Sequence, residues 1–469
     1  MITFNYTGGL LHCEGVPVRE ITKRTGTPVY IYSKNKILKN LAEYGKAFSS
    51  VPHLLCYAVK ANTGYAVCKT IFSAGAGAEV ASGGELYRVL KAGADPRKIV
   101  FSGAGKTREE IEFAIRNGVL LINAESVEEL SLINTLAGRM ERAGQTGGAP
   151  RRAGGTSRVG QAGGTRQKIL VGIRVNPDID PHTHRHITTG KSENKFGIPL
   201  PFAMNVYRGS GQYSNLSVEG VHCHIGSQIV STKPFVEMCM KLSSLIKKLR
   251  STGIPVKWTD IGGGLGIKYK DESPPSPTEL ARKILPVLKP LGTKIILEPG
   301  RYIVGNAGIL VTKVIYRKRG MQKNFLVVDA GMTDLIRPAL YDAYHEISPV
   351  EKSLAGRRRV DRVQADRVQA DRVRVGRMQA GRMQVGRMQV DVVGPICETS
   401  DYLGWDRHLP WLPQGALLAV SCAGAYSSSM SSTYNSRPRA TEVMVDGAVW
   451  KIIREREDYG DLTRGERTG

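Results

Sequence analysis

Short apolar runs alternate with amphipathic segments between about residue 54 and residue 298 of the chain. The runs are LLCYAVK (54–60), AGAEVAS (76–82), KIVFS (98–102), VLLIN (119–123), ILVGIRV (169–175), VEGVHCHIG (218–226), VKWTDIG (256–262) and KIILEPG (294–300). The segments between them, such as TREEIEFAIRNG, place apolar residues at helical spacing, and several end in glycine, as helices often do. Eight strand–helix units of this kind predict an α/β fold, the (β/α)8 TIM barrel.

The rest of the chain has a different pattern. Stretches such as GILVTKVIYRKR, KNFLVVDAG and TEVMVDGAVWKIIRER are rich in β-branched and aromatic residues and are separated by turns that contain Gly or Asn. The N-terminal stretch LLHCEGVPVREI has the same character. We therefore predict a barrel domain over residues 31–300. Residues 1–30 and 301–469 together are expected to form a second, mainly antiparallel β domain, similar to a β-sandwich or a Greek key.

Two low-complexity segments interrupt this pattern, at residues 138–167 and 356–391. The first is rich in Gly, Ala, Thr and Arg and cannot bury enough apolar surface to offset the entropy of ordering its backbone, so we expect a disordered insertion. The second contains six five-residue units, from DRVQA to GRMQV. A period of five matches neither the helix nor the strand repeat, so no steady buried face results and a solvated surface loop is expected.

The formal net charge of +24 would ordinarily suggest a nucleic-acid partner. The two insertions supply 11 of these charges, with six Arg against one Glu in the first and ten Arg against four Asp in the second. The charge therefore argues for a polyanion-binding arm only as an alternative. The seven Cys form no CxxC pair, which favours reduced thiols, and no stretch reaches the about 18 apolar residues of a membrane span. A cytoplasmic protein is expected.

Polar residues gather where the predicted strands end. In chain order they are Lys60, Glu79, Ser82, Ser102, Asn123, Arg174, His224, the Gly262–Gly264 turn, Glu298 and Arg301. Active sites of TIM barrels lie at this end, so these residues are expected to share one site. A lysine that is partly desolvated there loses proton affinity and becomes an amine nucleophile, and a glycine turn lets backbone N–H groups approach a phosphate.

The residues that carry this chemistry also follow a family pattern. YAVKAN, AEVASGGEL, HCHIGSQ, DIGGGLG, LEPGR, MTDLIRPALY, CETSD and GAY…YNSRPR resemble, in this order, the motifs of the diaminopimelate decarboxylases. These belong to the barrel-type pyridoxal-phosphate enzymes that also include ornithine and arginine decarboxylases. The resemblance runs from about residue 8 to residue 460, apart from the insertions. It implies decarboxylation of meso-2,6-diaminopimelate to L-lysine and CO₂, the last step of lysine biosynthesis.

The resemblance also implies which residues bind pyridoxal 5'-phosphate: Lys60 as a Schiff base, His224 stacked on the ring, Ser227, Gly264, Gly300 and Arg301 around the phosphate, Glu298 at the ring nitrogen, and Tyr426 between cofactor and substrate. The role of Glu298 is physically sound. A carboxylate there keeps the ring nitrogen protonated, so that the ring can accept electrons as CO₂ leaves.

A second set is implied for the substrate: Arg301, Arg337 and Tyr341 at the distal carboxylate, Glu398 at the distal ammonium, Tyr426 again, and Cys397 as the acid that reprotonates the α-carbon. A guanidinium fork suits a planar carboxylate. In the resembled family the equivalents of Cys397 and Glu398 come from the partner chain, which implies a homodimer with shared active sites.

Alternatives and departures remain. One alternative is a related ornithine, arginine or carboxynorspermidine decarboxylase, which would keep the cofactor residues. Another, from a different functional class, is a polyanion-binding protein with a vestigial barrel. Alternating histidines (His182, His184, His186; His222, His224) raise a metal site, but no Cys or carboxylate lies beside them at ligand spacing, so none is expected. Glu79 stands where the family more often has Asp, and Ser427–Ser428 where it has Gly-Phe.

Overall fold

The computed structural model describes residues 3–145, 168–181, 189–190, 194–352, 388–410 and 412–467. The chain divides into two compact units. The barrel unit comprises Tyr32–Ile309 and Cys422–Met430, and the β unit comprises Met1–Ile31, Leu310–Ser421 and Ser431–Gly469. Within the described ranges, no helix combines the length and the apolar character that a bilayer span requires.

The barrel unit is a closed parallel barrel, as predicted. Its strands pair in the order β5 (His53–Ala58), β6 (Gly77–Val80), β7 (Ile99–Phe101), β8 (Leu121–Ala124), β9 (Ile169–Asn176), β11 (Leu216–His222), β12 (Trp258–Asp260) and β13 (Lys294–Leu297). Strand β13 pairs with β5 and thereby closes the ring. Each of the eight apolar runs contributes one of these strands, because parallel strands that are buried on both faces require continuous apolar sequence. The short strand β10 (Ile198–Pro199) pairs with β9 beside the ring.

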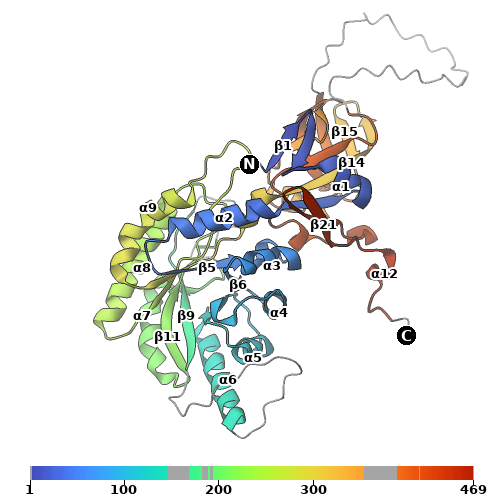
Figure 1. The fold of residues 1–469 in the computed structure, drawn as a ribbon. Helices are drawn as coiled ribbons and strands as arrows, with labels where there is room; N and C mark the ends of the chain where they lie inside the picture. The colour runs from blue at the N-terminus through green and yellow to red at the C-terminus, as the bar shows by residue number, and fades with distance from the viewer. Residues whose placement is uncertain are drawn as a thin grey trace, which may run out of the picture. The chain divides into compact units, whose positions relative to one another are not determined.

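Helices surround these strands (Figure 1): α2 (Lys34–Ala47), α3 (Tyr65–Ser73), α4 (Gly83–Lys91), α5 (Arg108–Asn117), α6 (Val127–Gln145), α7 (Leu200–Gly209), α8 (Lys233–Ser251) and α9 (Pro277–Leu288). Their starts are encoded locally. A capping box formed by Thr107 and Glu110 begins α5, which ends at Gly118 in the left-handed conformation. Ser82 likewise caps α4, since its hydroxyl accepts a hydrogen bond from the Glu85 amide at 3.2 Å. Ser82 therefore caps this helix, and its place in the site stays a prediction.

Two segments placed beyond the barrel by the sequence pattern belong to the barrel unit. The predicted boundary at residue 300 is too early, because the Asn40 side chain on α2 donates hydrogen bonds to the carbonyls of Tyr302 and Ile303 at 3.0 and 2.9 Å. These contacts anchor the short helix α10 (Arg301–Val304). Residues 422–430 also join this unit, where the Tyr426 amide donates to the Ala61 carbonyl at 2.7 Å.

Each predicted insertion has one wrong boundary, because a helix or a strand extends into it. Helix α6 continues through residues 138–145, because Leu130, Ile133 and Leu136 are buried at helical spacing and the residues that follow favour helix. Strand β17 (Met388–Val393) takes the last three residues of the repeat, where Val390 is buried and lies opposite Arg407. Neighbouring strands supply the pairing that the five-residue period alone does not. The remainder of both predicted insertions lies outside the described residues.

The β unit is mainly antiparallel, as predicted. The strands β1 (Phe4–Thr7), β2 (Leu10–Cys13) and β3 (Val16–Pro17) form a small sheet. The main sheet follows the order β18 (Tyr402–Leu409), β17, β15 (Asn324–Val328), β14 (Gly308–Arg319), β4 (Val29–Ser33), β20 (Thr441–Asp446) and β21 (Val449–Arg454). Strands β16 (Ile347–Pro349) and β19 (Leu417–Val420) join it through antiparallel pairing with each other and with β14, whereas β15 and β17 pair in parallel. The N-terminal residues thus lie in the same unit as the C-terminal strands.

Candidate active site

Lys60 lies in the single turn η1 (Val59–Ala61) that follows β5. Its Nζ is 3.2 and 3.4 Å from the two carboxylate oxygens of Glu79, which is 2 % exposed near the end of β6. Loss of water around Lys60 by itself lowers its pKa, but the negative charges of Glu79 and Glu298 outweigh this and raise the pKa above the ordinary value. The prediction of reduced proton affinity is therefore wrong, because the neighbouring carboxylates hold Lys60 as an ammonium.

Glu79 is a suitable acceptor for the proton that Lys60 must lose before it can attack. Burial raises the pKa of Glu79 to about 7, although the positive charge of Lys60 works against the rise. A group that titrates near neutral pH can both take up and return a proton. The carboxylate of Glu79, one methylene longer than the family's more usual Asp, still reaches the amine within hydrogen-bond distance.

Glu298 follows β13 and is 5 % exposed. Its Oε2 lies 3.6 Å from His222 Nε2, and its Oε1 has no hydrogen-bond partner within the part of the chain that the structure describes. Burial by itself would raise the pKa of Glu298, but His222, Lys60 and Asp260 lower it to about 2. Burial lowers the pKa of His222 as well, so a neutral His222 leaves the ammonium of Lys60 as the positive charge that favours the ionised form of Glu298. Glu298 therefore presents an anionic oxygen that needs a donor.

The turn after β12 brings the backbone close to its neighbours. A Cβ on Gly263 would lie 2.1 Å from the Glu298 carbonyl oxygen, and one on Gly264 would lie 2.4 Å from the Gly226 carbonyl oxygen. The Gly263 amide donates to Nδ1 of His224 at 3.3 Å, so this nitrogen is unprotonated. Loss of water and the positive charge of Lys60 lower the pKa of His224 well below its ordinary value. His224 is thus a neutral ring that accepts a hydrogen bond from the glycine turn.

Arg301 begins α10 and is 5 % exposed. Its Nη2 and Nε donate to the Ser227 hydroxyl at 3.0 and 3.3 Å, and its Nη1 donates to the Tyr269 hydroxyl at 2.7 Å. The guanidinium lies 4.8 Å from the centre of the Tyr426 ring. Gly300 leaves room beside it, since a Cβ there would lie 2.9 Å from that of Ala61. These contacts join a cation and hydroxyl groups in the arrangement that an anion such as phosphate requires.

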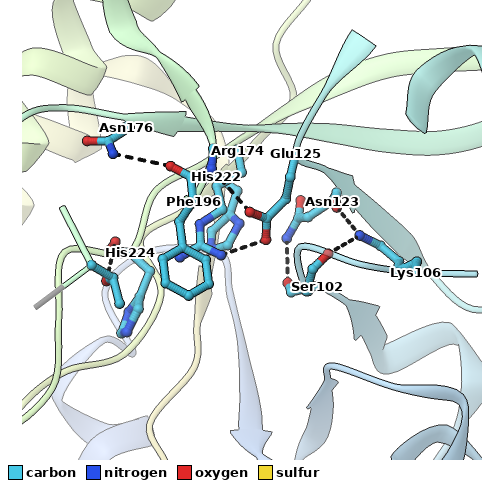
Figure 2. A network of polar contacts seen from close by, with 12 residues as sticks. Ser102, Lys106, Asn123, Glu125, Arg174, Asn176, Phe196, His222 and His224 are labelled. Carbon is cyan, nitrogen blue, oxygen red and sulfur yellow. Dashed lines mark hydrogen bonds and ion pairs between the residues drawn. The ribbon is translucent and has the colours of Figure 1, made fainter. Parts of the chain in front are cut away.

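A buried polar network supports the strand ends behind these residues (Figure 2). The Asn123 side chain donates to Ser102 at 3.1 Å, and the buried Lys106 donates to the Asn123 carbonyl at 2.8 Å. The Asn123 side chain also donates to Asp260 at 3.0 Å. Lys106 also pairs with Glu129 at 2.6 Å, and Arg174 pairs with Glu125 at 2.6 Å. The sequence analysis did not identify Lys106, Glu125 or Tyr269. Only Glu125 had a signal, since it comes two residues after a predicted strand.

The proposed substrate residues of the β unit have their own surroundings. Arg337 begins α11 (Arg337–Tyr341), is 4 % exposed, and its Nη1 lies 2.7 Å from Nε2 of His345. Tyr341 ends the same helix. Cys397 and Glu398 have exposed side chains, and the Cys397 amide donates to the Asn435 side chain at 2.8 Å. Their place in one site with Lys60 stays a prediction.

The histidine pattern has two outcomes. His182, His184 and His186 lie outside the described residues. His222 lies near two carboxylates, since the ligand atoms of His222, Asp260 and Glu298 are all within 4.8 Å of one another. Sequence spacing did not show this cluster, because its members come from three different strands. The absence of a metal site stays a prediction.

Comparisons with known proteins agree with this geometry. Residues 34–305 match the model of the pyridoxal-dependent decarboxylase family, pyridoxal binding domain. The chain is 42% identical over 455 residues to the diaminopimelate decarboxylase of Aquifex aeolicus, which covers 97% of this chain and 95% of that relative. It is 41% identical over 461 residues to that of Vibrio cholerae, with 98% and 97% covered. The chain belongs to the diaminopimelate decarboxylase family.

Solved structures of this family share the fold. The diaminopimelate decarboxylase of Helicobacter pylori complexed with L-lysine superposes with a TM-score of 0.80 at 35% identity, covering 95% of this chain and 98% of that chain. The enzyme from M. jannaschii in complex with L-lysine gives a TM-score of 0.84 at 32% identity, covering 100% and 98%. The likeness spans both units and not the barrel alone.

The residues present fit the cofactor of the diaminopimelate decarboxylase family. Glu298 Oε1, which is buried and has no hydrogen-bond partner among the described residues, is an acceptor for a protonated ring nitrogen. The glycine turn offers backbone N–H groups, and Arg301 with the Ser227 hydroxyl offers a cation and a hydroxyl group, which are donors that suit a phosphate. Lys60 is the amine beside them. The departure at Ser427–Ser428 is accommodated, since Ser427 is buried and its hydroxyl donates to the Ala425 carbonyl at 3.3 Å.

Proposed function

We propose that this chain decarboxylates meso-2,6-diaminopimelate to L-lysine and CO₂ with pyridoxal 5'-phosphate, the last step of lysine biosynthesis. The observation that carries the proposal is that Lys60 and Glu298 follow the neighbouring strands β5 and β13, which pair with each other. One supplies an amine, and the other supplies a buried carboxylate oxygen in need of a donor. Two of the similar structures are complexes with L-lysine, which is the proposed product.

The bound cofactor supplies an electron sink for the electron pair that CO₂ leaves behind. The chain's own groups prepare and protect that chemistry. Glu79 takes the proton that Lys60 must release, and Glu298 holds a proton at the ring nitrogen. The neutral His224 packs on the ring face without adding a competing positive charge. Arg301, through Ser227, fixes the anionic end and so orients the cofactor.

Recognition of the rest of the substrate is assigned to the β unit by family resemblance. Arg337 and Tyr341 are proposed to bind the distal carboxylate together with Arg301, and Glu398 to bind the distal ammonium, while Tyr426 lies between substrate and cofactor. Cys397 is proposed as the acid that protonates the α-carbon. A homodimer with shared active sites and a cytoplasmic location belong to the same proposal.

A substrate panel tests the function directly. The purified chain, supplied with pyridoxal 5'-phosphate, is offered meso-diaminopimelate, ornithine, arginine and carboxynorspermidine, and both CO₂ and the amine product are measured. We expect equal amounts of CO₂ and lysine from diaminopimelate and little turnover of the others. Faster turnover of another substrate would assign that activity instead. Binding of nucleic acid that falls steeply with salt, without any decarboxylation, would favour the polyanion-binding alternative.

A further inference from the structure

A second carboxyl group lies beside Glu298, and the proposed mechanism does not use it. Asp260 ends β12 and is 1 % exposed, and β12 pairs with β13, which leads into Glu298. One carboxylate oxygen of Asp260, one of Glu298 and one ring nitrogen of His222 lie within 4.8 Å of one another. Two carboxylates this close and removed from water cannot both be charged without a large cost, so the pair holds one proton.

The contacts around the pair indicate where this proton resides. Glu298 has the positive charge of Lys60 nearby, and this favours its ionised form. Asp260 receives only neutral donors in the described structure: the Asn123 amide reaches its Oδ2 at 3.0 Å, and the Gly262 amide reaches its Oδ1 at 2.9 Å. Burial and the charge of Glu298 raise the pKa of Asp260 well above its ordinary value. The proton therefore belongs on Asp260.

We propose that Asp260 is a positioning residue of the cofactor site, a neutral carboxylic acid that donates a hydrogen bond to Glu298 and aims its other oxygen at the ring nitrogen. The inference rests on the proposed cofactor site. A neutral donor suits this task, because a cation in the same place would compete with the ring nitrogen for the charge of Glu298. Asp260 restrains the carboxylate and leaves its charge to act on the cofactor.

Asn123 holds Asp260 in turn. Its side-chain amide donates to Ser102, and its backbone carbonyl accepts from the buried Lys106 (Figure 2). The same side-chain amide donates to Asp260, so these contacts join the ends of β7, β8 and β12. The Asn123 Oδ1 has no hydrogen-bond partner within the described residues. Rotation of this amide would present Oδ1 to an amide at position 260, and the Ser102 hydroxyl can donate as well as accept. The site can thus accommodate Asp260→Asn.

Three variants of the cofactor-loaded protein test the assignment. Difference infrared spectra between the wild type and Asp260→Asn at pH 7 should show the C=O band of a protonated carboxyl group, present only in the wild type. The band should persist in the matched control Asn123→Ala, which keeps both carboxyl groups. Asp260→Ala should weaken cofactor binding at least about tenfold, because it removes a donor to a charged acceptor, whereas Asp260→Asn should weaken it by clearly less.

Two results would overturn the proposal. One is the absence of the carboxyl band from the wild type. The other is an Asp260→Asn variant that binds the cofactor as poorly as Asp260→Ala, as expected if Asp260 served as a charged metal ligand with His222. If Asp260→Ala does not fold, the infrared comparison with Asp260→Asn still decides. Neither readout involves the substrate, so a positive result with no turnover of diaminopimelate would reject the proposed function and keep this inference.

Discussion

Two sets of proposed functional residues are held in different ways: the buried Glu79, Glu298 and Arg301 of the barrel unit, and the exposed pair Cys397 and Glu398 of the β unit. In the barrel unit Glu79, Glu298 and Arg301 are 2 to 5 % exposed, and each contacts other residues of the site. The pKa of Glu79 is raised and the pKa of Glu298 is lowered. In the β unit Cys397 and Glu398 have exposed side chains. Buried charges keep a fixed geometry because their desolvation must be balanced by specific contacts. The barrel site is therefore organised in advance for a cofactor, whereas an exposed pair gains its function only when substrate or another surface removes the water around it.

The largest effect is expected in the preorganised region. Lys60→Ala removes the only amine proposed to bind the cofactor covalently, so decarboxylation should fall by at least about a thousandfold while the chain stays folded. The measurements are CO₂ release and the mass of the chain after borohydride reduction with the cofactor. The exposed Lys91 provides the matched control, since Lys91→Ala should behave like the wild type. A reducible cofactor adduct on another lysine would refute the assignment.

Mixing two inactive variants tests whether the exposed residues act on another chain. If the sites of a homodimer are shared, a Lys60→Ala chain and a Cys397→Ala chain form one intact site and one doubly defective site. With random exchange, half of the dimers are mixed, so about a quarter of the native activity should return. Subunit exchange is verified by mass. A mixture that remains inactive after exchange would show that Cys397 serves its own chain or is not the acid.

Glu398→Ala tests the specificity assigned to the same exposed pair. The distal ammonium of diaminopimelate would lose its partner, at a cost of about 2–5 kcal/mol in the free energy of transition-state binding. The value of kcat/KM should fall accordingly, while the affinity for the cofactor, which the barrel unit provides, stays the same. Glu398→Gln is the matched variant, because it keeps the shape but not the charge. Unchanged kinetics in both would mean that the substrate pocket is elsewhere.

The sequence predicted the scaffold better than it predicted the electrostatics. Each apolar run became a barrel strand, because period and length are local properties, and Lys60, His224 and Glu298 all follow the expected strands. The pKa of Lys60 was predicted in the wrong direction, since it depends on Glu79 from another strand. The same reason hid the contact between Asp260 and Glu298. Lys106 gave no signal at all, because its role depends on the Asn123 carbonyl of strand β8 as well as on the Gly103 carbonyl of its own loop.

A buried carboxyl group in the β unit, that of Asp334, should make the stability of the protein depend on pH. Asp334 is 6 % exposed, and burial raises its pKa from 3.8 to about 6. A carboxyl whose pKa is raised on folding binds more protons in the folded state, so its contribution to stability is present below pH 4 and is lost as the pH rises through about 6. As the pH rises through this range, the free energy of unfolding should therefore fall by up to about 3 kcal/mol less in Asp334→Asn than in the wild type, since each pKa unit corresponds to about 1.4 kcal/mol. The check is urea unfolding at pH 4, 5, 6 and 7, and an equal slope in both proteins would contradict it.

The smallest effect is expected at the repeat in the β unit, provided that the deletion respects strand β17. Replacing residues 356–387 by a Gly/Ser linker of about ten residues should leave kcat/KM within about twofold, because closure entropy changes only slowly with loop length. Extending the same replacement to residue 390 removes Val390, which is buried opposite Arg407, together with the pair Gln389 and His408. Loss of a buried valine costs about 1.5–3 kcal/mol, so the longer deletion should unfold at lower urea. Equal stability of the two deletions would show that β17 does not depend on its first three residues. Lost activity in the shorter one would show that the repeat takes part in the function of the β unit.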